Sequence, residues 1–217
     1  MSALVTLEHV GMHFAVRPDH ESGKHTVFEG INLILDEGDR LGIVGRNGAG
    51  KSTLLRIMAK IYAPASGTVT WAPGVTVSLL SLGLGFKNDL TGRDNAYLAG
   101  LLQGLTKHDA KQGLAAIEDF CELGDYFDEP VKTYSAGMRA RLGFATALLN
   151  NASVLLIDEV LSVGDKNFRE RARESLHQRM CERQACVLVS HADTYIQSVC
   201  SKTMNLEAGA LIPCDTP

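Results

Sequence analysis

The chain of 217 residues lacks any CxxC pair, although it contains five cysteines. Their odd number and irregular spacing favour reduced thiols over a disulfide framework, which argues against a small disulfide-stapled secreted domain. The chain also lacks net positive charge, since 21 Lys and Arg stand against 25 Asp and Glu to give a formal charge of −4. Nucleic-acid-binding domains normally carry a basic surface, so we expect no nucleic-acid partner.

Long hydrophobic runs are also missing. No stretch approaches the 18 or more apolar residues that a membrane-spanning helix needs. The N-terminal residues MSALVTLEH contain no basic segment followed by an apolar one, so we expect no signal peptide. Any role at a membrane would therefore require a membrane-embedded partner, and the cytoplasm is the compartment that we expect. The length and the hydrophobic content of 45% predict one domain, or one domain with a sub-domain.

One glycine-rich stretch carries the strongest chemical signal. Residues 45–53, GRNGAGKST, match the P-loop pattern GxxxxGK[ST]. The apolar run before it predicts a buried strand over 40–45, and the apolar spacing after it predicts a helix that begins at Ser52 and ends by Ala63–Pro64. Glycines let consecutive backbone N–H groups face one anion, and the helix N-terminus adds partial positive charge. Lys51 would reach the β- and γ-phosphates, and the Ser52 hydroxyl would ligate Mg²⁺. The predicted nucleotide-binding residues here are Arg46, Asn47, Gly48, Ala49, Gly50, Lys51, Ser52 and Thr53.

Three further motifs complete the candidate site. Asp158 and Glu159 end an apolar run that starts at Val154, which is where a P-loop enzyme places a Mg²⁺ ligand and a base for the attacking water. Ser135 and Gly137 open a predicted helix and could offer a hydroxyl and free N–H groups to an anion. His191 ends another apolar strand, from which it could bond a γ-phosphate. Each motif also has a structural explanation: a turn after the strand, an ordinary helix cap, or a structural histidine.

The hydrophobic patterning predicts an α/β fold. Alternating strands are expected over 3–14 and 27–35, and this opening predicts a small antiparallel sheet that leads into a parallel core. Residues 67–82 alternate again as strands, interrupted by Pro73–Gly74. Other predicted core elements are a helix over 135–150, buried strands at 154–158 and 185–190, an amphipathic helix over 166–183 and a hairpin over 203–212. Helical spacing at 94–105 and 109–123 predicts a mostly helical sub-domain, at about 83–134, inserted into this core.

These pieces, in this order, resemble the nucleotide-binding domain of ATP-binding-cassette (ABC) transporters over nearly the whole chain. The Walker A motif matches 45–53, the signature motif 134–138, the Walker B motif 154–158 and the D-loop 161–165. The resemblance implies a P-loop NTPase core and a homodimer that binds two ATP and Mg²⁺. Its members use a catalytic glutamate, a switch histidine and a D-loop aspartate, which match Glu159, His191 and Asp165 in this sequence. Ser135 and Gly137 would then cover the ATP of the partner subunit.

Two variant motifs resemble one branch of that family. The signature is YSAGM rather than LSGGQ, and the D-loop is SVGD rather than SALD. Both variants, and the stretch 83–95, are similar to the branch that exports cell-surface polysaccharides such as capsule, O-antigen or teichoic-acid chains. The family's Q-loop glutamine is missing, and either Lys87 or Ser81 takes its place. Phe14 is our prediction for the aromatic residue that stacks on adenine; the alternative is a plain core phenylalanine.

We therefore expect an ATPase subunit with Lys51, Glu159 and His191 as its catalytic residues and with Ser52 and Asp158 as its metal ligands. It would bind peripherally to the cytoplasmic face of the inner membrane through a separate permease. The alternatives are an ABC ATPase without a permease, as in translation or DNA repair, an ABC importer ATPase, and a regulatory module that binds ATP without hydrolysing it. Glu159 argues against the last of these.

Overall fold

The computed structural model describes residues 2–15, 23–80, 85–148, 152–158, 165–181, 184–189, 196 and 198–214. It divides the chain into two compact units. Unit 1 comprises Met1–Leu79, Ser153–Asp158 and Met180–Pro217, and unit 2 comprises Leu80–Ala152 and Glu159–Arg179. The segment predicted as a helical sub-domain, about 83–134, lies in unit 2. Unit 2 also contains two later helices, one before and one after residues 153–158.

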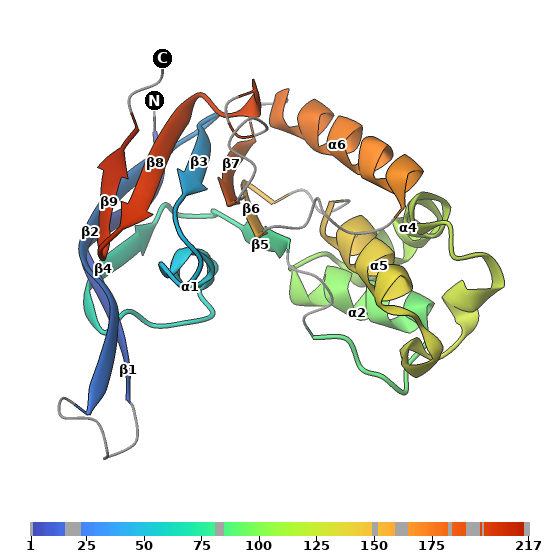
Figure 1. Ribbon diagram of the computed structural model, residues 1–217. Helices are drawn as coiled ribbons and strands as arrows, with labels where there is room; N and C mark the ends of the chain where they lie inside the picture. Colours follow the sequence, from blue (N-terminus) through green and yellow to red (C-terminus); the bar gives the residue numbers. More distant parts are fainter. Residues whose placement is uncertain are drawn as a thin grey trace. The chain divides into compact units, whose positions relative to one another are not determined.

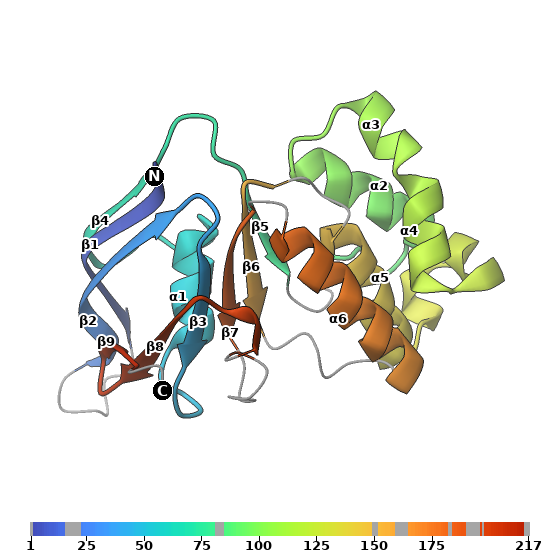
Figure 2. The same cartoon turned by 90° about the horizontal axis from the view of Figure 1, so that it is seen from above.

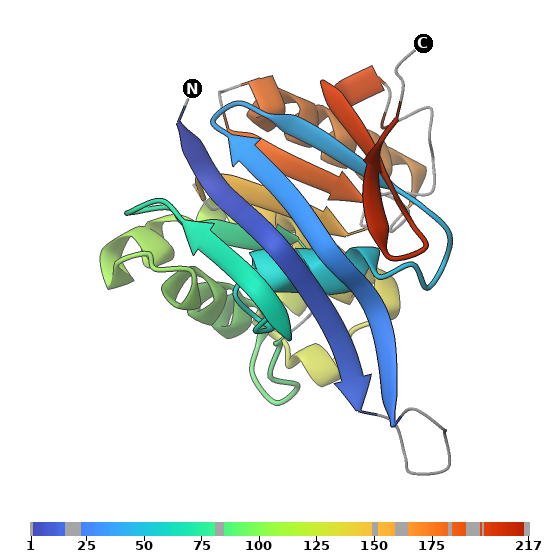
Figure 3. The ribbon, with the colours of Figure 1, turned by 90° about the vertical axis from the view of Figure 1, so that its left-hand side faces the viewer.

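An antiparallel sheet of three strands forms one part of unit 1, where the sequence predicted a small antiparallel sheet from its first two strands. It contains β1 (Ala3–Ala15), β2 (Lys24–Asp36) and β4 (Ser66–Trp71) in the order β2-β1-β4, and Figure 3 shows the three side by side. Alternate side chains of β2 are buried from Ile31 to Leu35, because successive residues of a strand face opposite sides of the sheet. The strand β2 begins at Lys24, three residues before the predicted start.

The second sheet carries the parallel core. Its strands are β5 (Val77–Leu80), β6 (Val154–Asp158), β7 (Ala185–Val189), β3 (Arg40–Val44), β8 (Lys202–Glu207) and β9 (Ala210–Pro213), in this spatial order. The strand β3 pairs in parallel with both β7 and β8, and β6 pairs in parallel with β7. Every residue of β7 is buried, as expected for a parallel strand covered on both faces. The predicted α/β fold is therefore confirmed.

The P-loop helix is shorter than predicted. Helix α1 spans Lys51–Met58 and does not continue toward Ala63–Pro64. Lys60 takes the left-handed conformation, with φ 63°, while its N–H donates to Ile57 O and the N–H of Ile61 donates to Arg56 O. This pair of bonds is the Schellman helix end, which usually uses glycine at the left-handed position. Because a lysine occupies it here, no glycine marked the end of the helix in the sequence.

The regular secondary structure described in unit 2 is helical, apart from Leu80 of β5. Its α-helices are α2 (Gly92–Leu102), α3 (Lys107–Gln112), α4 (Leu114–Cys121), α5 (Ala136–Leu148) and α6 (Lys166–Cys181), the last running to Arg179 within this unit. Figures 1 and 2 show α5 and α6 side by side. The predicted helix over 109–123 is instead two short helices that meet at Gly113, because glycine is a weak helix former. The hydrophobic core of unit 2 includes Phe127, Tyr134 and Leu142.

Two absences predicted from the sequence concern membranes and disulfides. Within the described residues, no helix has the length and apolar character of a membrane span.

Among the described cysteines, Cys121, Cys186 and Cys200 are thiols. Burial raises the pKa of Cys121 to about 11 and that of Cys186 to about 12, so both are poor nucleophiles near neutral pH.

Candidate functional site

The glycines of the P-loop are required by its geometry at two positions. Gly45 follows β3 with φ 147°, and a Cβ there would lie 2.5 Å from the carbonyl oxygen of Leu206. Gly50 has φ 101°, and its Cβ would lie 2.4 Å from Cγ1 of Val27. Contacts this short do not occur with a real side chain, so both positions need glycine. The chain can therefore turn sharply from β3 into α1.

The start of α1 leaves backbone donors available to an anion. Gly50 is the N-cap residue, and because glycine has no side chain it cannot cap the first turn. The N–H groups of Lys51, Ser52 and Thr53 belong to the first turn, where a helix offers them no carbonyl partner. Together with the positive end of the helix dipole, they form a cradle suited to phosphate.

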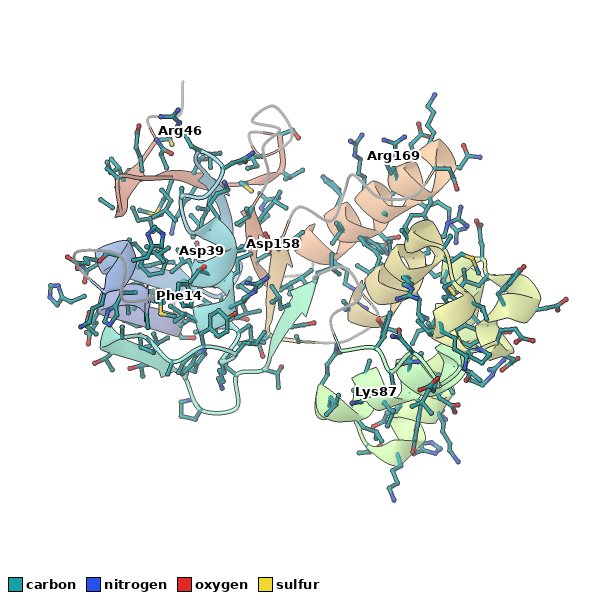
Figure 4. All side chains as sticks on the ribbon, turned by 60° about the horizontal axis from the view of Figure 1, so that its bottom comes forward. Phe14, Asp39, Arg46, Lys87, Asp158 and Arg169 are labelled. Carbon is teal, nitrogen blue, oxygen red and sulfur yellow. The ribbon has the colours of Figure 1, made fainter. Side chains whose placement is uncertain are left out.

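The Lys51 side chain is held against this loop. It is only 5% exposed, and its Nζ donates to the carbonyls of Gly45 at 2.7 Å and Arg46 at 3.0 Å. These two bonds place a cation beside the N–H groups of the loop. Both bonds given for Nζ go to backbone carbonyls, so no carboxylate among them neutralises the charge of Lys51. Arg46 itself is exposed (Figure 4). A multiply charged anion in the loop would therefore meet Lys51 as well as the backbone donors.

The register of the parallel strands brings the predicted metal ligands together. Asp158 lies opposite Val189 of β7, which in turn lies opposite Ile43 of β3, two residues before Gly45. The last residue of β6 thus lies at the same, carboxyl-terminal end of the parallel strands as the P-loop. The Ser52 hydroxyl donates to Oδ1 of Asp158 at 2.9 Å, although the two residues are 106 positions apart.

A hydroxyl and a carboxylate are suitable ligands for Mg²⁺, which prefers oxygen donors and usually keeps water and phosphate oxygens in its shell. The described residues contain no group of three or more His, Cys, Asp or Glu that could hold a metal. The donor set of Ser52 and Asp158 therefore fits an ion held jointly by the protein and a nucleotide, rather than a closed protein site.

The signature motif opens α5 in unit 2. The exposed Ser135 accepts a bond from the Met138 N–H at 3.2 Å, as a helix-capping serine does. At Gly137, an added Cβ would approach only Ser135 Oγ, at 3.8 Å. The packing described within this chain therefore does not require glycine there. The preceding Tyr134 is buried and its hydroxyl donates to the carbonyl of Tyr126 at 2.5 Å, so the motif starts from a fixed anchor.

The loop that contains Lys87 is held by a residue that sequence reasoning missed. Asn95 of α2 is 3% exposed, and its Oδ1 accepts from the Lys87 N–H at 2.8 Å. Its Nδ2 contacts the carbonyls of Lys87, Leu90 and Thr91 at 3.1, 3.2 and 2.8 Å. The sequence signal that could have indicated this role is an asparagine, Asn95, one helical turn after the capping Thr91. The Lys87 side chain itself is exposed, and Figure 4 labels it.

Asp165 has two partners within unit 2. Its Oδ1 accepts from the Phe168 N–H at 3.0 Å, which caps α6, and its Oδ2 accepts from the guanidinium of Arg141. The capping bond and then Arg141 hold the pKa of Asp165 below its ordinary value. Arg141 of α5 is a second residue that sequence reasoning missed, because a mid-helix arginine has no distinctive pattern.

Phe14 lies near the end of β1 (Figure 4) and is 39% exposed, with its ring edge-on to Tyr62 at a centroid distance of 6.2 Å. It is therefore not a core phenylalanine, and one ring face remains a candidate for stacking. Glu159, His191 and Ser81 lie outside the described residues, so their predicted roles stay predictions.

Comparison with known proteins gives a family, relatives and a fold. A family model described as "ABC transporter" matches residues 28–162. The chain is 37% identical over 193 residues to the O-antigen export system ATP-binding protein RfbB of Myxococcus xanthus, covering 89% of this chain and 44% of that protein. It is 40% identical to the ATP-binding protein BexA of Haemophilus influenzae, covering 88% of this chain and 85% of that one. A solved structure, the dimeric post-hydrolysis state of the ATP-binding cassette MJ0796 bound to ADP and Pi, superposes with a TM-score of 0.79 at 20% identity, over 96% of both chains.

Proposed function

The chain belongs to the ABC transporter family, and we propose that it is the ATP-hydrolysing subunit that powers export of a cell-surface polysaccharide through a separate membrane permease. The observation that carries the ATPase is the hydrogen bond of 2.9 Å between the P-loop hydroxyl of Ser52 and the strand-end carboxylate of Asp158. This bond joins the phosphate-binding loop to the strand-end carboxylate that P-loop phosphoryl transfer requires for Mg²⁺.

The P-loop holds the ATP phosphates in this proposal. The backbone N–H groups of residues 48–53 face the β- and γ-phosphates, and Lys51 exchanges its bonds to the two loop carbonyls for bonds to phosphate oxygens. Its position beside the loop supports this role, because the cation needs only a small side-chain movement. When Mg²⁺ is bound, it supplies charge neutralisation on the β- and γ-phosphate oxygens, and Ser52 and Asp158 are the residues that hold it.

The adenine stacks on Phe14. The ring is partly exposed near the end of β1, the central strand of the antiparallel sheet. It is nearly perpendicular to the ring of Tyr62, an arrangement that leaves a face of Phe14 for the base. Base–aromatic stacking of this kind contributes about 1–3 kcal/mol.

Hydrolysis is assigned to a homodimer with two ATP sites. Glu159 orients and deprotonates the attacking water, and His191 bonds the γ-phosphate. Ser135 and Gly137 of each subunit cover the ATP of the other. The exposed hydroxyl of Ser135, and a glycine that no described packing requires at 137, support a role toward a partner molecule. The dimeric state described for the cassette MJ0796 provides a precedent in the same fold.

Polysaccharide export is supported by the relative from Myxococcus xanthus, an O-antigen export system ATP-binding protein. The variant signature and D-loop motifs point to the same branch. The protein would act at the cytoplasmic face of the inner membrane, held there by its permease. The segment around Lys87, which replaces the Q-loop, is the part of unit 2 that we assign to contact with that permease.

Light scattering of the Glu159→Gln variant tests the ATPase mechanism. Removing the base while keeping the site should trap a closed dimer, so the mass should double with ATP and Mg²⁺ and stay monomeric without them. The matched control is Glu159→Gln combined with Lys51→Ala, which should remain a monomer because it cannot hold the phosphates. A protein that binds ATP yet never dimerises would contradict the shared sites.

Recovery of the permease from native membranes tests the export assignment. A tagged Glu159→Gln protein should co-purify with an integral membrane protein of an export system. Recovery of a solute-importer permease would overturn the export proposal while leaving the ATPase intact. Recovery of ribosomes or DNA-repair factors in place of any membrane protein would identify an ABC ATPase without a permease.

A further inference from the structure

Three phenylalanine rings and two arginines join α4, α5 and α6 within unit 2. The rings of Phe120, Phe144 and Phe168 have pairwise centroid distances of 5.7–5.8 Å. Arg141 lies over Phe168 at 5.2 Å, and Arg171 lies over Phe120 at 5.1 Å. Both guanidinium groups thus cover the same aromatic cluster, an arrangement that favours arginine over lysine because its planar group stacks on rings.

The two arginines also share an acidic partner. Glu122 follows α4 in the left-handed conformation, with φ 50°, and its carboxylate bonds Arg171 and lies 3.7 Å from Arg141. Arg141 and Arg171 are therefore matched in chemistry, in aromatic contact and in their partner Glu122. Both therefore pack on the aromatic cluster that joins the three helices.

One contact distinguishes them. Arg141 also donates to Asp165, the residue that caps α6, whereas the ion pair given for Arg171 is with Glu122 alone. The side chain of Arg141 is 20% exposed against 36% for Arg171, so solvent screens its ion pairs less. Because Ser135 immediately precedes α5 and Arg141 lies within the same helix, this contact joins the helix that carries the signature motif to the end of the D-loop.

We propose that Arg141 is a positioning residue of the ATPase: it holds Asp165 at a fixed place relative to Ser135, so that both enter the closed dimer in the correct geometry. The inference rests on the proposed function, because the positioned residues act in ATP hydrolysis. A guanidinium has enough N–H groups to pair with the carboxylates of Glu122 and Asp165 at once. Groups that are placed before closure need no ordering during it, and small displacements of such groups are costly for the rate.

Steady-state ATPase assays of Arg141→Ala and Arg171→Ala, with ADP binding measured by calorimetry, test this role. We expect Arg141→Ala to lower kcat about ten-fold or more and to leave the ADP Kd within about two-fold, because the P-loop lies in unit 1. Arg171→Ala should keep kcat within about two-fold of wild type. Arg141→Lys, which retains one ion pair, should restore kcat to within about three-fold of wild type.

Equal losses of kcat in the two alanine variants would overturn the proposal, since they would show that packing alone matters. Where Arg141→Ala does not fold, Asp165→Asn tests the same contact, because asparagine also caps helices but loses the ion pair. It should lower kcat as Arg141→Ala does, and the double variant should be no slower than either single one. An unchanged kcat in Asp165→Asn would also overturn the proposal. Wild-type protein without ATPase activity would instead refute the proposed function itself.

Discussion

Replacement of Asn95 by alanine should destabilise unit 2 more than any other single amide deletion in the Lys87 loop. The Asn95 side chain is 3% exposed, and its amide bonds the backbone of Lys87, Leu90 and Thr91. The three carbonyls each keep another donor, from the N–H groups of Leu90, Val131 and Asn95 itself. The Lys87 N–H keeps no partner that the structure gives.

The magnitude follows from this inventory. Leaving the Lys87 N–H without an acceptor costs about 1–3 kcal/mol, and losing the two donor hydrogens of the amide costs about 1 kcal/mol more. Alanine returns about 0.5 kcal/mol because it is a better helix former than asparagine. We therefore expect Asn95→Ala to lower the free energy of unfolding by about 1.5–3.5 kcal/mol. Asn95→Asp should be at least as damaging, since a carboxylate would face three carbonyls.

Urea unfolding followed by circular dichroism at 222 nm is the suitable assay, because the regular secondary structure described in unit 2 is helical, apart from Leu80. Fluorescence would follow the wrong unit, since the only tryptophan, Trp71, lies in β4 of unit 1. The matched control is Asn88→Ala, whose exposed amide has only a 3.4 Å contact with Arg139; it should cost about 0.5 kcal/mol or less. Equal midpoints for the two alanine variants would refute the assignment of Asn95 as the residue that holds the loop.

Three further outcomes are expected. Gly50→Ala should weaken ADP binding at least about ten-fold, since a Cβ at φ 101° would lie 2.4 Å from Val27; unchanged affinity by calorimetry would contradict the loop geometry. Phe14→Ala should weaken ATP binding by about 1–3 kcal/mol while Phe14→Trp retains it, and equal affinities in a fluorescent-nucleotide titration would assign the stacking elsewhere. The pKa of Asp165 is lower in the folded protein, so its contribution to stability is complete above the unfolded pKa of about 3.9 and is lost as the pH falls through the folded pKa. The stability difference between wild type and Asp165→Asn should therefore shrink from pH 7 to pH 3, and a constant difference would refute this cause.

Much of the site could be predicted because its signals are local. The residues Gly45, Gly50, Lys51 and Ser52 lie within eight positions, and the phosphate cradle depends on the order of glycines, a lysine and a helix start. The parallel core was similarly predictable, since buried strands such as 154–158 read as unbroken apolar runs. The family resemblance, the α/β class and the ATP-binding assignment all followed from these short patterns.

Element ends were less predictable when an unusual residue took a special conformation. Lys60 ends α1 in the left-handed region, where glycine is the usual signal. Glu122 ends α4 in the same conformation, with φ 50°. In both places the side chain gives no sign of the backbone angle, so the sequence predicted helices that extend too far.

The sequence by itself determined the identity of the phosphate loop, the acids and the signature, because each of these is a short run whose residue types carry the chemistry. Only the tertiary structure decided which distant groups meet. The register of β3, β7 and β6 brings Ser52 to Asp158 across 106 positions, and the packing of three helices gives Arg141 its contact with Asp165. Side-chain partners that are far apart along the chain depend on strand register and helix packing, and these are set by the whole core rather than by any local pattern.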